Sequence, residues 1–241
     1  MSRTPTREEL SHDRLGDAFA RALSSYDTRR RVEVLAGEFL TDGMVRDRDT
    51  LDVGCGLGFF SERLHQRGAR VTACDIGPGL VARTARRVGC EAVVADALAL
   101  STHLGQGRFD LVVSSECIEH TPDPPRAVRE MIAVLRPGGY LSLSTPNLLW
   151  YPVVRAATVL RLRPFDGFEN FSSWWGLRRV IEEAGARVVR EKGLHLYPFQ
   201  LGMHGLSRLL DRRAQALKGL MINMCFLAQK RADGSFTSSH P

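Results

Sequence analysis

The sequence lacks the features of membrane-spanning, secreted and disulfide-rich proteins. No uninterrupted apolar run reaches the roughly 18 residues that a membrane-spanning helix needs. The segment from Met1 to Arg14 is polar and mixed in charge, unlike a secretory signal. The five cysteines, at positions 55, 74, 90, 117 and 225, form no CxxC pair and no disulfide-like spacing. These absences predict a cytoplasmic protein in a reducing compartment, without a transmembrane segment.

Lysine is also scarce, and nearly all of the positive charge comes from arginine. Lys192, Lys218 and Lys230 are the only lysines, although the net charge is +6. No zinc-finger or RNA-binding signature accompanies the run Arg29–Arg31, and such runs on a helix are usually a solvated face. We therefore expect no nucleic-acid partner. Hydrophobic content of 44% in 241 residues fits a single domain, 1–241, with a substantial core.

From Thr50 onward, short apolar runs alternate with helical stretches. This alternation is typical of a parallel sheet that is covered on both faces by helices. We expect strands near 50–54, 70–75, 91–95, 109–114, 139–145, 187–193 and 221–229. Helices are expected near 58–67, 79–88, 125–135 and 173–184, with Arg136–Gly139 as the turn that stops one helix before the next strand. The predicted fold class is α/β, with a Rossmann-like seven-stranded sheet.

Two segments interrupt this alternation, and a third ends the chain. Residues 1–45 carry apolar side chains at helical spacing and predict an N-terminal helical cap. Residues 147–172 follow the fifth strand, and are too apolar for a plain loop, so we expect a lid insertion with Pro164 and Gly167 as hinges. Arginines beside large apolar residues in 148–163 leave peripheral membrane contact open as an alternative use. Residues 233–241 are expected to form a flexible tail.

The strongest local signal is the sequence LDVGCGLGFF at 51–60, a strand that ends in a glycine-rich turn. Gly54, Gly56 and Gly58 make GxGxG, whereas the dinucleotide fingerprint is GxGxxG, so pyrophosphate binding is disfavoured. Asp75 follows the second strand, where a carboxylate can accept hydrogen bonds from both hydroxyls of a ribose. Asp96 follows the third strand and suits the exocyclic amine of an adenine. A helix N-cap is the alternative role for each acid.

Together these pieces resemble class I S-adenosylmethionine-dependent methyltransferases, and specifically the ubiquinone-pathway O-methyltransferases. The similar stretches are LDVGCG at 51–56, FDLVVSSECIEHTPDP at 109–124, LRPGGYLSLSTPN at 135–147, GLHLYP at 193–198 and MINMCFLAQK at 221–230. The resemblance implies S-adenosylmethionine as cofactor, with Arg31 near the methionine carboxylate and Arg29 and Arg30 as competitors for that place. The cofactor-binding residues expected from it and from the glycine loop are Arg31, Asp52, Gly54, Cys55, Gly56, Gly58, Asp75, Ile76, Asp96, Ala97 and Ser115.

The segment Glu116–His120 follows the fourth strand and is the predicted catalytic element. On an α-helical turn, Glu116, Glu119 and His120 would converge, and two carboxylates with an imidazole suit a divalent cation. The resemblance implies such a metal near the acceptor; the family's further histidine is missing, and Asp166 or Glu169 is the candidate fourth ligand, which would favour Mg²⁺. In the competing interpretation His120, with Glu119, is a metal-free general base. In a third, the acids only favour the start of a helix.

We expect an enzyme that methylates a hydroxyl of a small phenol- or catechol-like molecule in quinone-type or secondary-metabolite biosynthesis. Trp150, Tyr151 and Phe168, with Trp174 and Trp175, are candidate walls for an apolar acceptor, with core packing as the alternative for the Trp pair. Other functions that the fold supports are N- or C-methylation, RNA 2′-O-methylation and non-catalytic cofactor binding.

Overall fold

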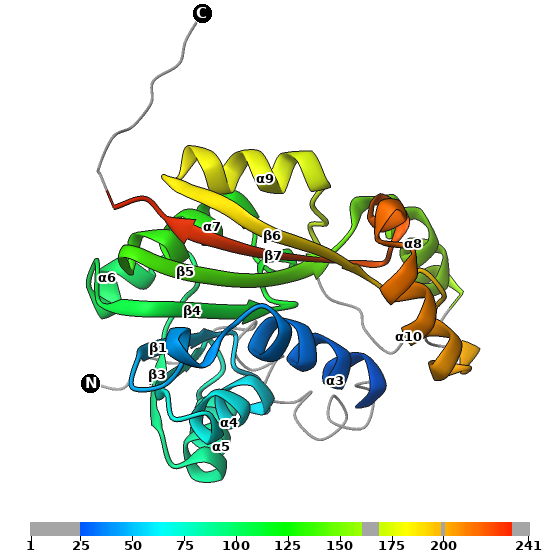
Figure 1. The fold of residues 1–241 in the computed structure, drawn as a ribbon. Coiled ribbons are helices and arrows are strands. Elements are labelled where there is room, and N and C mark those ends of the chain that lie inside the picture. Colours follow the sequence, from blue (N-terminus) through cyan, green and yellow to red (C-terminus); the bar gives the residue numbers. More distant parts are fainter. Residues whose placement is uncertain (1–24, 161–168, 199–200, 233–241) are drawn as a thin grey trace, which may run out of the picture.

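The protein contains one mixed sheet of seven strands in the order β3-β2-β1-β4-β5-β7-β6 (Figure 1). The computed structural model describes residues 25–160, 169–198 and 201–232. The strands are β1 (Asp49–Val53), β2 (Arg70–Asp75), β3 (Glu91–Val94), β4 (Phe109–Ser115), β5 (Leu135–Pro146), β6 (Ala186–Leu194) and β7 (Asn223–Lys230). All seven strands expected from the sequence are confirmed. Strand β7 runs antiparallel to both β5 and β6, whereas the alternation pattern predicted a parallel sheet.

Helices cover both faces of the sheet, as predicted (Figure 1). The expected helices are α4 (Phe59–Gln66), α5 (Pro78–Val88), α7 (Pro124–Ala133) and α9 (Trp174–Glu183). Capping defines two of the starts, because the side chain of Asp123 accepts from Arg126 N and that of Ser173 accepts from Gly176 N. The short α6 (Leu100–Leu104) and α10 (His204–Arg213) were not predicted.

The sheet separates two apolar cores, since its central strands are buried on both faces. On one face, helices α7 and α9 pack side chains such as Met131 and Ile181 onto the sheet. On the other face lie Leu35 and Phe39, together with Leu64 of α4. This two-sided burial explains why successive residues of a central strand are buried, as in 50–53 of β1, even where one of them is polar.

The predicted stop at Arg136–Gly139 is wrong in detail, because these residues lie inside β5. Phe109 of β4 pairs with Leu135, but Leu111 pairs with Tyr140, so the β5 side carries extra residues at a break in register. Gly138 adopts a φ of 79° there, a conformation that glycine tolerates. Proline and glycine therefore mark a bulge within a strand here.

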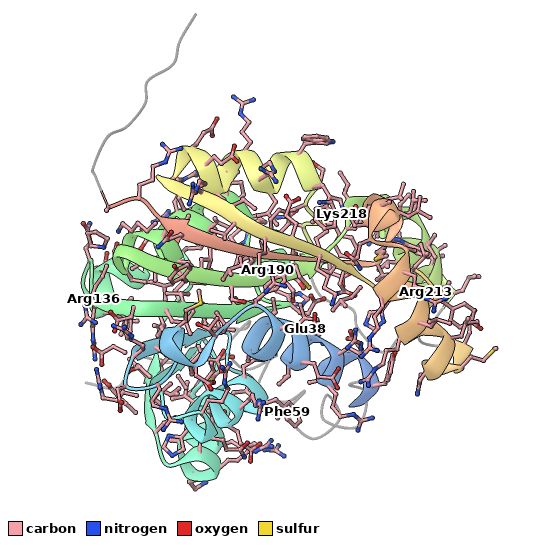
Figure 2. The ribbon with its side chains drawn as sticks, viewed as in Figure 1. Glu38, Phe59, Arg136, Arg190, Arg213 and Lys218 are labelled. Atoms are coloured by element: carbon pink, nitrogen blue, oxygen red, sulfur yellow. The ribbon has the colours of Figure 1, made fainter. Side chains whose placement is uncertain are left out.

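The described part of the N-terminal segment is helical and packs on the sheet. Helix α3 (Ser25–Glu33) continues as a π-helix over Val34–Glu38, and a 3₁₀ turn follows at Asp42–Met44. Arg190 of β6 donates to the main-chain oxygen of Glu38, and Lys192 pairs with the carboxylate of Glu38; Figure 2 labels Arg190 and Glu38. Residues 1–24 lie outside the described residues.

The segment expected to be a lid leaves the sheet and returns to the same place. Asn147 and Ser172 form an isolated bridge, so the two ends of the insertion are joined. Between them lie a 3₁₀ turn (Leu148–Trp150) and helix α8 (Tyr151–Val159). The Trp150 indole donates to Leu220 O, in the 3₁₀ segment Gln215–Leu220 that precedes β7. The hinge residues Pro164 and Gly167 lie outside the described residues.

Helix α8 is expected to exchange its amide hydrogens rapidly without acceptor and slowly with it. None of its residues is buried, and Val153 and Val159 are 56% and 75% exposed, so little packing holds it in place. Hydrogen exchange with and without acceptor measures this, and α7, with Ala127 and Val128 fully buried, is the internal control. Strong, equal protection of α8 in both states would mean that it is fixed core.

Within the described part of the chain, no helix combines the length and the apolar character needed to cross a membrane.

Candidate active site

The glycine-rich turn after β1 lies against the turn after β4, at the carboxyl ends of adjacent strands. Gly54, Gly56 and Gly58 have φ values of 72°, 51° and 81°, a region that L side chains rarely occupy. A Cβ on Gly54 would lie 2.6 Å from the Sγ of Cys117, which follows β4. Glycine is therefore required at 54 both by conformation and by close approach, and the two turns form one site.

Two acids follow the neighbouring strands at the same edge. Asp75, at the end of β2, is buried and accepts from Gly56 N and Gly77 N, each at 3.0 Å. Asp96 follows β3 and accepts from Leu98 N at 2.8 Å. Both acids thus brace their own loops at the carboxyl ends of neighbouring strands, the edge at which such sheets bind ligands.

Asp52 lies in β1 just before the glycine turn and contacts helix α4. Its carboxylate is buried in β1 and accepts from the hydroxyl of Ser61 in α4, which ties the helix to the strand. Burial raises the pKa of Asp52 to about 6, against the Ser61 hydrogen bond, which lowers it. These contacts indicate that Asp52 shapes the turn from beneath.

Cys55, Ile76 and Ala97 complete the predicted cofactor set and lie on the three turns just described. Cys55 is buried, and its amide donates to Cys74 O, so its main chain holds the turn to β2. Burial raises the pKa of its thiol above the usual range. Ile76 and Ala97 are partly exposed beside Asp75 and Asp96.

Of the three adjacent arginines, Arg31 is the one that reaches the end of β4. Its Nη1 donates to the Oγ of Ser115 at 2.7 Å, and Ser115 also shares a hydrogen bond with Ser144 of β5. Burial alone would lower the pKa of Arg31, but the adjacent Asp27 raises it above its usual value. By contrast, Arg29 points to solvent and Arg30 pairs with Glu33. Only the folded chain distinguishes these three residues.

The α-helical turn that was expected to carry Glu116, Glu119 and His120 does not form. Glu116 has a φ of 53° and ends the strand, and only Ile118–His120 form a helical turn, of the 3₁₀ type. Without an α-helix, the spacing of three and four residues no longer brings the side chains to one point. Among the described residues, no three His, Cys, Asp or Glu side chains are arranged to hold a metal ion. The described residues therefore do not support the predicted metal site, and Asp166, one candidate fourth ligand, lies outside them.

Each of the two glutamates has its own hydrogen-bond donors. The carboxylate of Glu116 accepts from Ser144 Oγ at 3.1 Å and from Asn223 Nδ2 at 2.9 Å. The carboxylate of Glu119 accepts from Thr145 Oγ1 at 3.1 Å. Burial, together with the proximity of Glu119, raises the pKa of Glu116 to about 7, against the effect of Arg31. Burial likewise raises the pKa of Glu119 to about 7, in spite of its hydrogen bonds.

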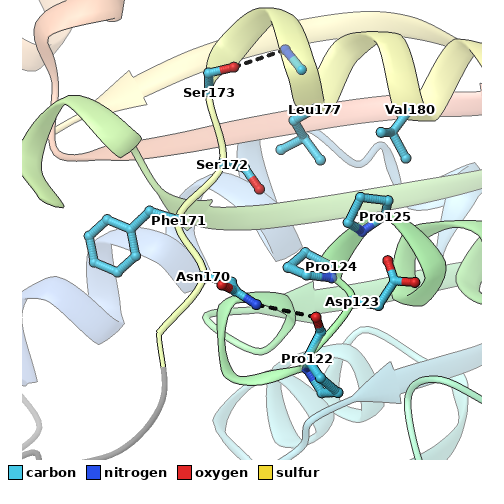
Figure 3. Close-up of a pocket in the computed structure, with 11 residues that line it drawn as sticks. Pro122, Asp123, Pro124, Pro125, Asn170, Phe171, Ser172, Ser173, Leu177 and Val180 are labelled. Atoms are coloured by element: carbon cyan, nitrogen blue, oxygen red, sulfur yellow. Dashed lines mark hydrogen bonds between the residues drawn. The ribbon is translucent and has the colours of Figure 1, made fainter.

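A cavity of about 380 Å³ lies beside the 3₁₀ turn, between the start of α7 and the start of α9 (Figure 3). Phe171, Leu177 and several prolines line it, and Asn170 donates from its main chain to Glu119 O at 2.7 Å. None of the predicted cofactor residues lines this cavity. It adjoins the 3₁₀ turn Ile118–His120 but not the glycine loop.

The predicted aromatic wall is only partly assembled. Tyr151 packs edge-on against Phe171, with ring centroids 5.4 Å apart, so it lies near the cavity. Trp174 packs against Phe226, so for this residue core packing is the correct interpretation. Trp175 is 82% exposed, so it is neither part of the core nor part of a wall around the acceptor. Phe168 lies outside the described residues.

Four site residues escaped the sequence analysis, namely Asp27, Ser144, His195 and Asn223. Asn223 carried a detectable signal, since it is a polar residue at the start of the largely apolar β7, whereas Ser144 is one of several small polar residues in β5. The sequence around Asp27 is misleading, because an acid four residues before an arginine on a helix usually forms an ion pair at the surface. His195 lies in the family-like stretch GLHLYP at 193–198, but nothing local in the sequence pointed to its partner Asp27.

The comparisons with known proteins agree with this arrangement. Residues 51–143 match the family described as "Methyltransferase domain". The ubiquinone biosynthesis O-methyltransferase of Bordetella avium is 33% identical over 170 residues, which are 65% of this chain and 69% of that protein.

Solved structures share the fold at lower identity. An S-adenosylmethionine-dependent methyltransferase from Mesorhizobium loti has a TM-score of 0.67 at 21% identity, covering 86% of this chain and 100% of that one. The magnesium protoporphyrin IX methyltransferase of Synechocystis PCC 6803, solved with bound SAH, has a TM-score of 0.65 at 16% identity, covering 93% and 100%. Strand order, glycine turn and sequence likeness thus agree, and the chain belongs to the S-adenosylmethionine-dependent methyltransferases, as a member of the family that includes the ubiquinone biosynthesis O-methyltransferases.

Proposed function

We propose that this enzyme methylates a hydroxyl of a small phenol- or catechol-like molecule, in quinone-type or secondary-metabolite biosynthesis. The observation that supports it most is the Glu119–His120 turn, which lies beside the glycine loop in a chain whose relative is an O-methyltransferase. A hydroxyl acceptor must lose a proton, and an imidazole can take it near neutral pH. Exposed apolar side chains on α8, such as Val153, suit an apolar acceptor. We place the enzyme in the cytoplasm.

The donor groups at the sheet edge fit S-adenosylmethionine. Asp75 would accept from the ribose hydroxyls and Asp96 from the adenine amine, while Arg31 would meet the carboxylate. The main chain is open above Gly56, because a Cβ there would meet only Gly54 O, at 4.0 Å. Cys55, Ile76, Ala97, Gly58 and Ser115 would complete the contacts, with Asp52 beneath them.

The chain's own groups would have to do little chemistry. When bound, S-adenosylmethionine supplies a methyl group that its sulfonium already activates. The protein orients the acceptor in line with that methyl group, and alignment of this kind can account for much of the rate. His120 would take the proton that the acceptor hydroxyl loses on methylation. Glu119 is buried next to it and holds the turn through Thr145. No step needs a metal.

Asp75→Asn should weaken the affinity for S-adenosylhomocysteine by about 1–3 kcal/mol, which is roughly 5- to 150-fold. The substitution keeps the size of the side chain but removes the charge and one acceptor. Calorimetric titration measures it, with NAD as a ligand expected not to bind, because the loop is GxGxG. Asp110→Asn, at the opposite end of the sheet, is the matched control. Tight NAD binding without a response to S-adenosylhomocysteine would refute the cofactor assignment.

The acceptor proposal is tested by incubating the enzyme with S-adenosylmethionine and panels of catechols, phenols, amines, activated carbon acids and short RNAs. Mass spectrometry of the products locates the methyl group. Products on oxygen are expected. Methylation on nitrogen or carbon would move the enzyme to the alternative class of natural-product methyltransferases, and RNA products would replace the small-molecule proposal. Turnover with none of them, despite tight cofactor binding, would favour a non-catalytic binding protein.

A further inference from the structure

A buried line of hydrogen bonds joins the turn after β6 to the end of β4. The Nε2 of His195 lies 2.9 Å from the Oδ1 of Asp27, and Asp27 is bound through both carboxylate oxygens by Arg31, at 2.9–3.2 Å. Arg31 then donates to Ser115 at 2.7 Å. His195 and Asp27 are 168 residues apart in sequence, so the fold alone brings them together.

These contacts fix the guanidinium of Arg31 in one orientation. A guanidinium has five N–H donors in a rigid plane. Among the described contacts, Nε and Nη2 are directed at Asp27 and one Nη1 hydrogen at Ser115. One hydrogen on each terminal nitrogen is directed at neither partner, and a guanidinium N–H is a strong donor to a carboxylate. Asp27 therefore decides which edge of Arg31 is presented to a ligand.

The carboxylate of Asp27 is a permanent anion. Burial alone would raise its pKa, but Arg31 and His195 outweigh burial and hold the pKa at about 2. Glu116 and Glu119 also attract Arg31 from the catalytic side. A firm anchor at Asp27 is needed if Arg31 is to keep its place against that attraction.

His195 is itself held in a conformation that is uncommon for residues other than glycine. It is fully buried with a φ of 63°, in the left-handed region. Its main-chain oxygen accepts from Ile222 N, and the next amide, Leu196 N, donates to the buried Asp211. A glycine would fit this main chain without strain but would leave Asp27 without the contact to Nε2, 2.9 Å away.

We infer that His195 is a positioning residue that acts through Asp27 to set the orientation of Arg31 toward the amino-acid end of the cofactor. The inference rests on the proposed function, in which Arg31 meets the methionine carboxylate. It predicts that His195 affects only those ligands that carry this carboxylate. 5′-Methylthioadenosine has the same nucleoside and sulfur but lacks the amino acid, so it separates positioning from general stability.

The experiment compares His195→Met with His195→Gln, two side chains of similar length of which only Gln can donate to Asp27. Calorimetry gives the dissociation constants for S-adenosylhomocysteine and for 5′-methylthioadenosine. We expect His195→Met to weaken S-adenosylhomocysteine about tenfold and 5′-methylthioadenosine by less than about twofold, and His195→Gln to stay near wild type. His103→Gln, on the surface of α6, is the control.

Equal losses for both ligands, or no loss for either, would overturn the positioning role. If His195→Met does not fold, Asp27→Asn gives the same comparison, because it weakens the same anchor. Arg31→Met distinguishes the proposed contact with the methionine carboxylate from the inference about His195. If Arg31→Met leaves S-adenosylhomocysteine unaffected, the proposed carboxylate contact is wrong; if it weakens that ligand while His195→Met does not, only the inference about His195 fails.

Discussion

His120→Ala is expected to lower kcat by about 10²–10⁴-fold and to leave the dissociation constant for S-adenosylhomocysteine nearly unchanged. The imidazole lies in the 3₁₀ turn after β4, whereas the cofactor is expected over the glycine turn and Asp75. Loss of the base therefore slows proton removal from the acceptor without removing a cofactor contact. Single-turnover kinetics with a catechol acceptor, together with calorimetry, measure the two effects separately.

His65→Ala is the matched control, because His65 is exposed on α4, away from the turn after β4. Raising the pH should partly restore His120→Ala when the acceptor ionises on its own, since the base is then unnecessary. A loss of cofactor affinity equal to the loss of rate would show that His120 is structural.

Chelation separates this mechanism from one that uses a metal. We expect full activity after exhaustive EDTA treatment and dialysis, because Glu116 and Glu119 are each directed to separate hydrogen-bond donors in β5 and β7. If EDTA abolished activity and Mg²⁺ restored it, the single-base mechanism would be wrong. Glu116 and Glu119 would then have to reorient when the acceptor binds.

Gly54→Ala is expected to abolish measurable S-adenosylhomocysteine binding and to destabilise the fold. A non-glycine residue at a φ of 72° costs about 1–3 kcal/mol. The new Cβ would also lie 2.6 Å from Sγ and 2.8 Å from Cβ of Cys117, and overpacking of this kind costs roughly another 1–3 kcal/mol. The turn must move, and the cofactor edge moves with it. Calorimetry and thermal unfolding with and without the ligand measure both losses.

Alanine substitutions at two further glycines are expected to reduce the affinity less than Gly54→Ala does. Gly56→Ala has conformational strain but no close contact, so we expect a smaller loss of affinity than at Gly54. Gly43→Ala has open space and no positive φ, and should change nothing. If Gly54→Ala bound as tightly as the Gly43 variant, the close approach of the two turns would have no role in cofactor binding.

Sequence alone was sufficient for the elements whose signals are local. The seven strands and four main helices follow from apolar periodicity and from caps such as Ser173, because each signal lies within the element it defines. The glycine turn and the acids after β2 and β3 could be placed together, since the carboxyl ends of parallel strands meet at one edge of the sheet. Helix α10 escaped because it lies in the connection between β6 and the reversed strand β7.

Only the tertiary structure decided the orientation of side chains whose partners are distant in sequence. Glu116 and Glu119 would converge on an α-helix. Instead, the pairing of β4 with β5 and of β5 with β7 places Ser144 and Asn223 beside Glu116, and Thr145 beside Glu119. The choice of Arg31 over its neighbours likewise depends on Ser115 and, through Asp27, on His195. A sequence pattern fixes which residues share an element, whereas hydrogen-bond partners 26 to 168 residues away fix where each side chain points.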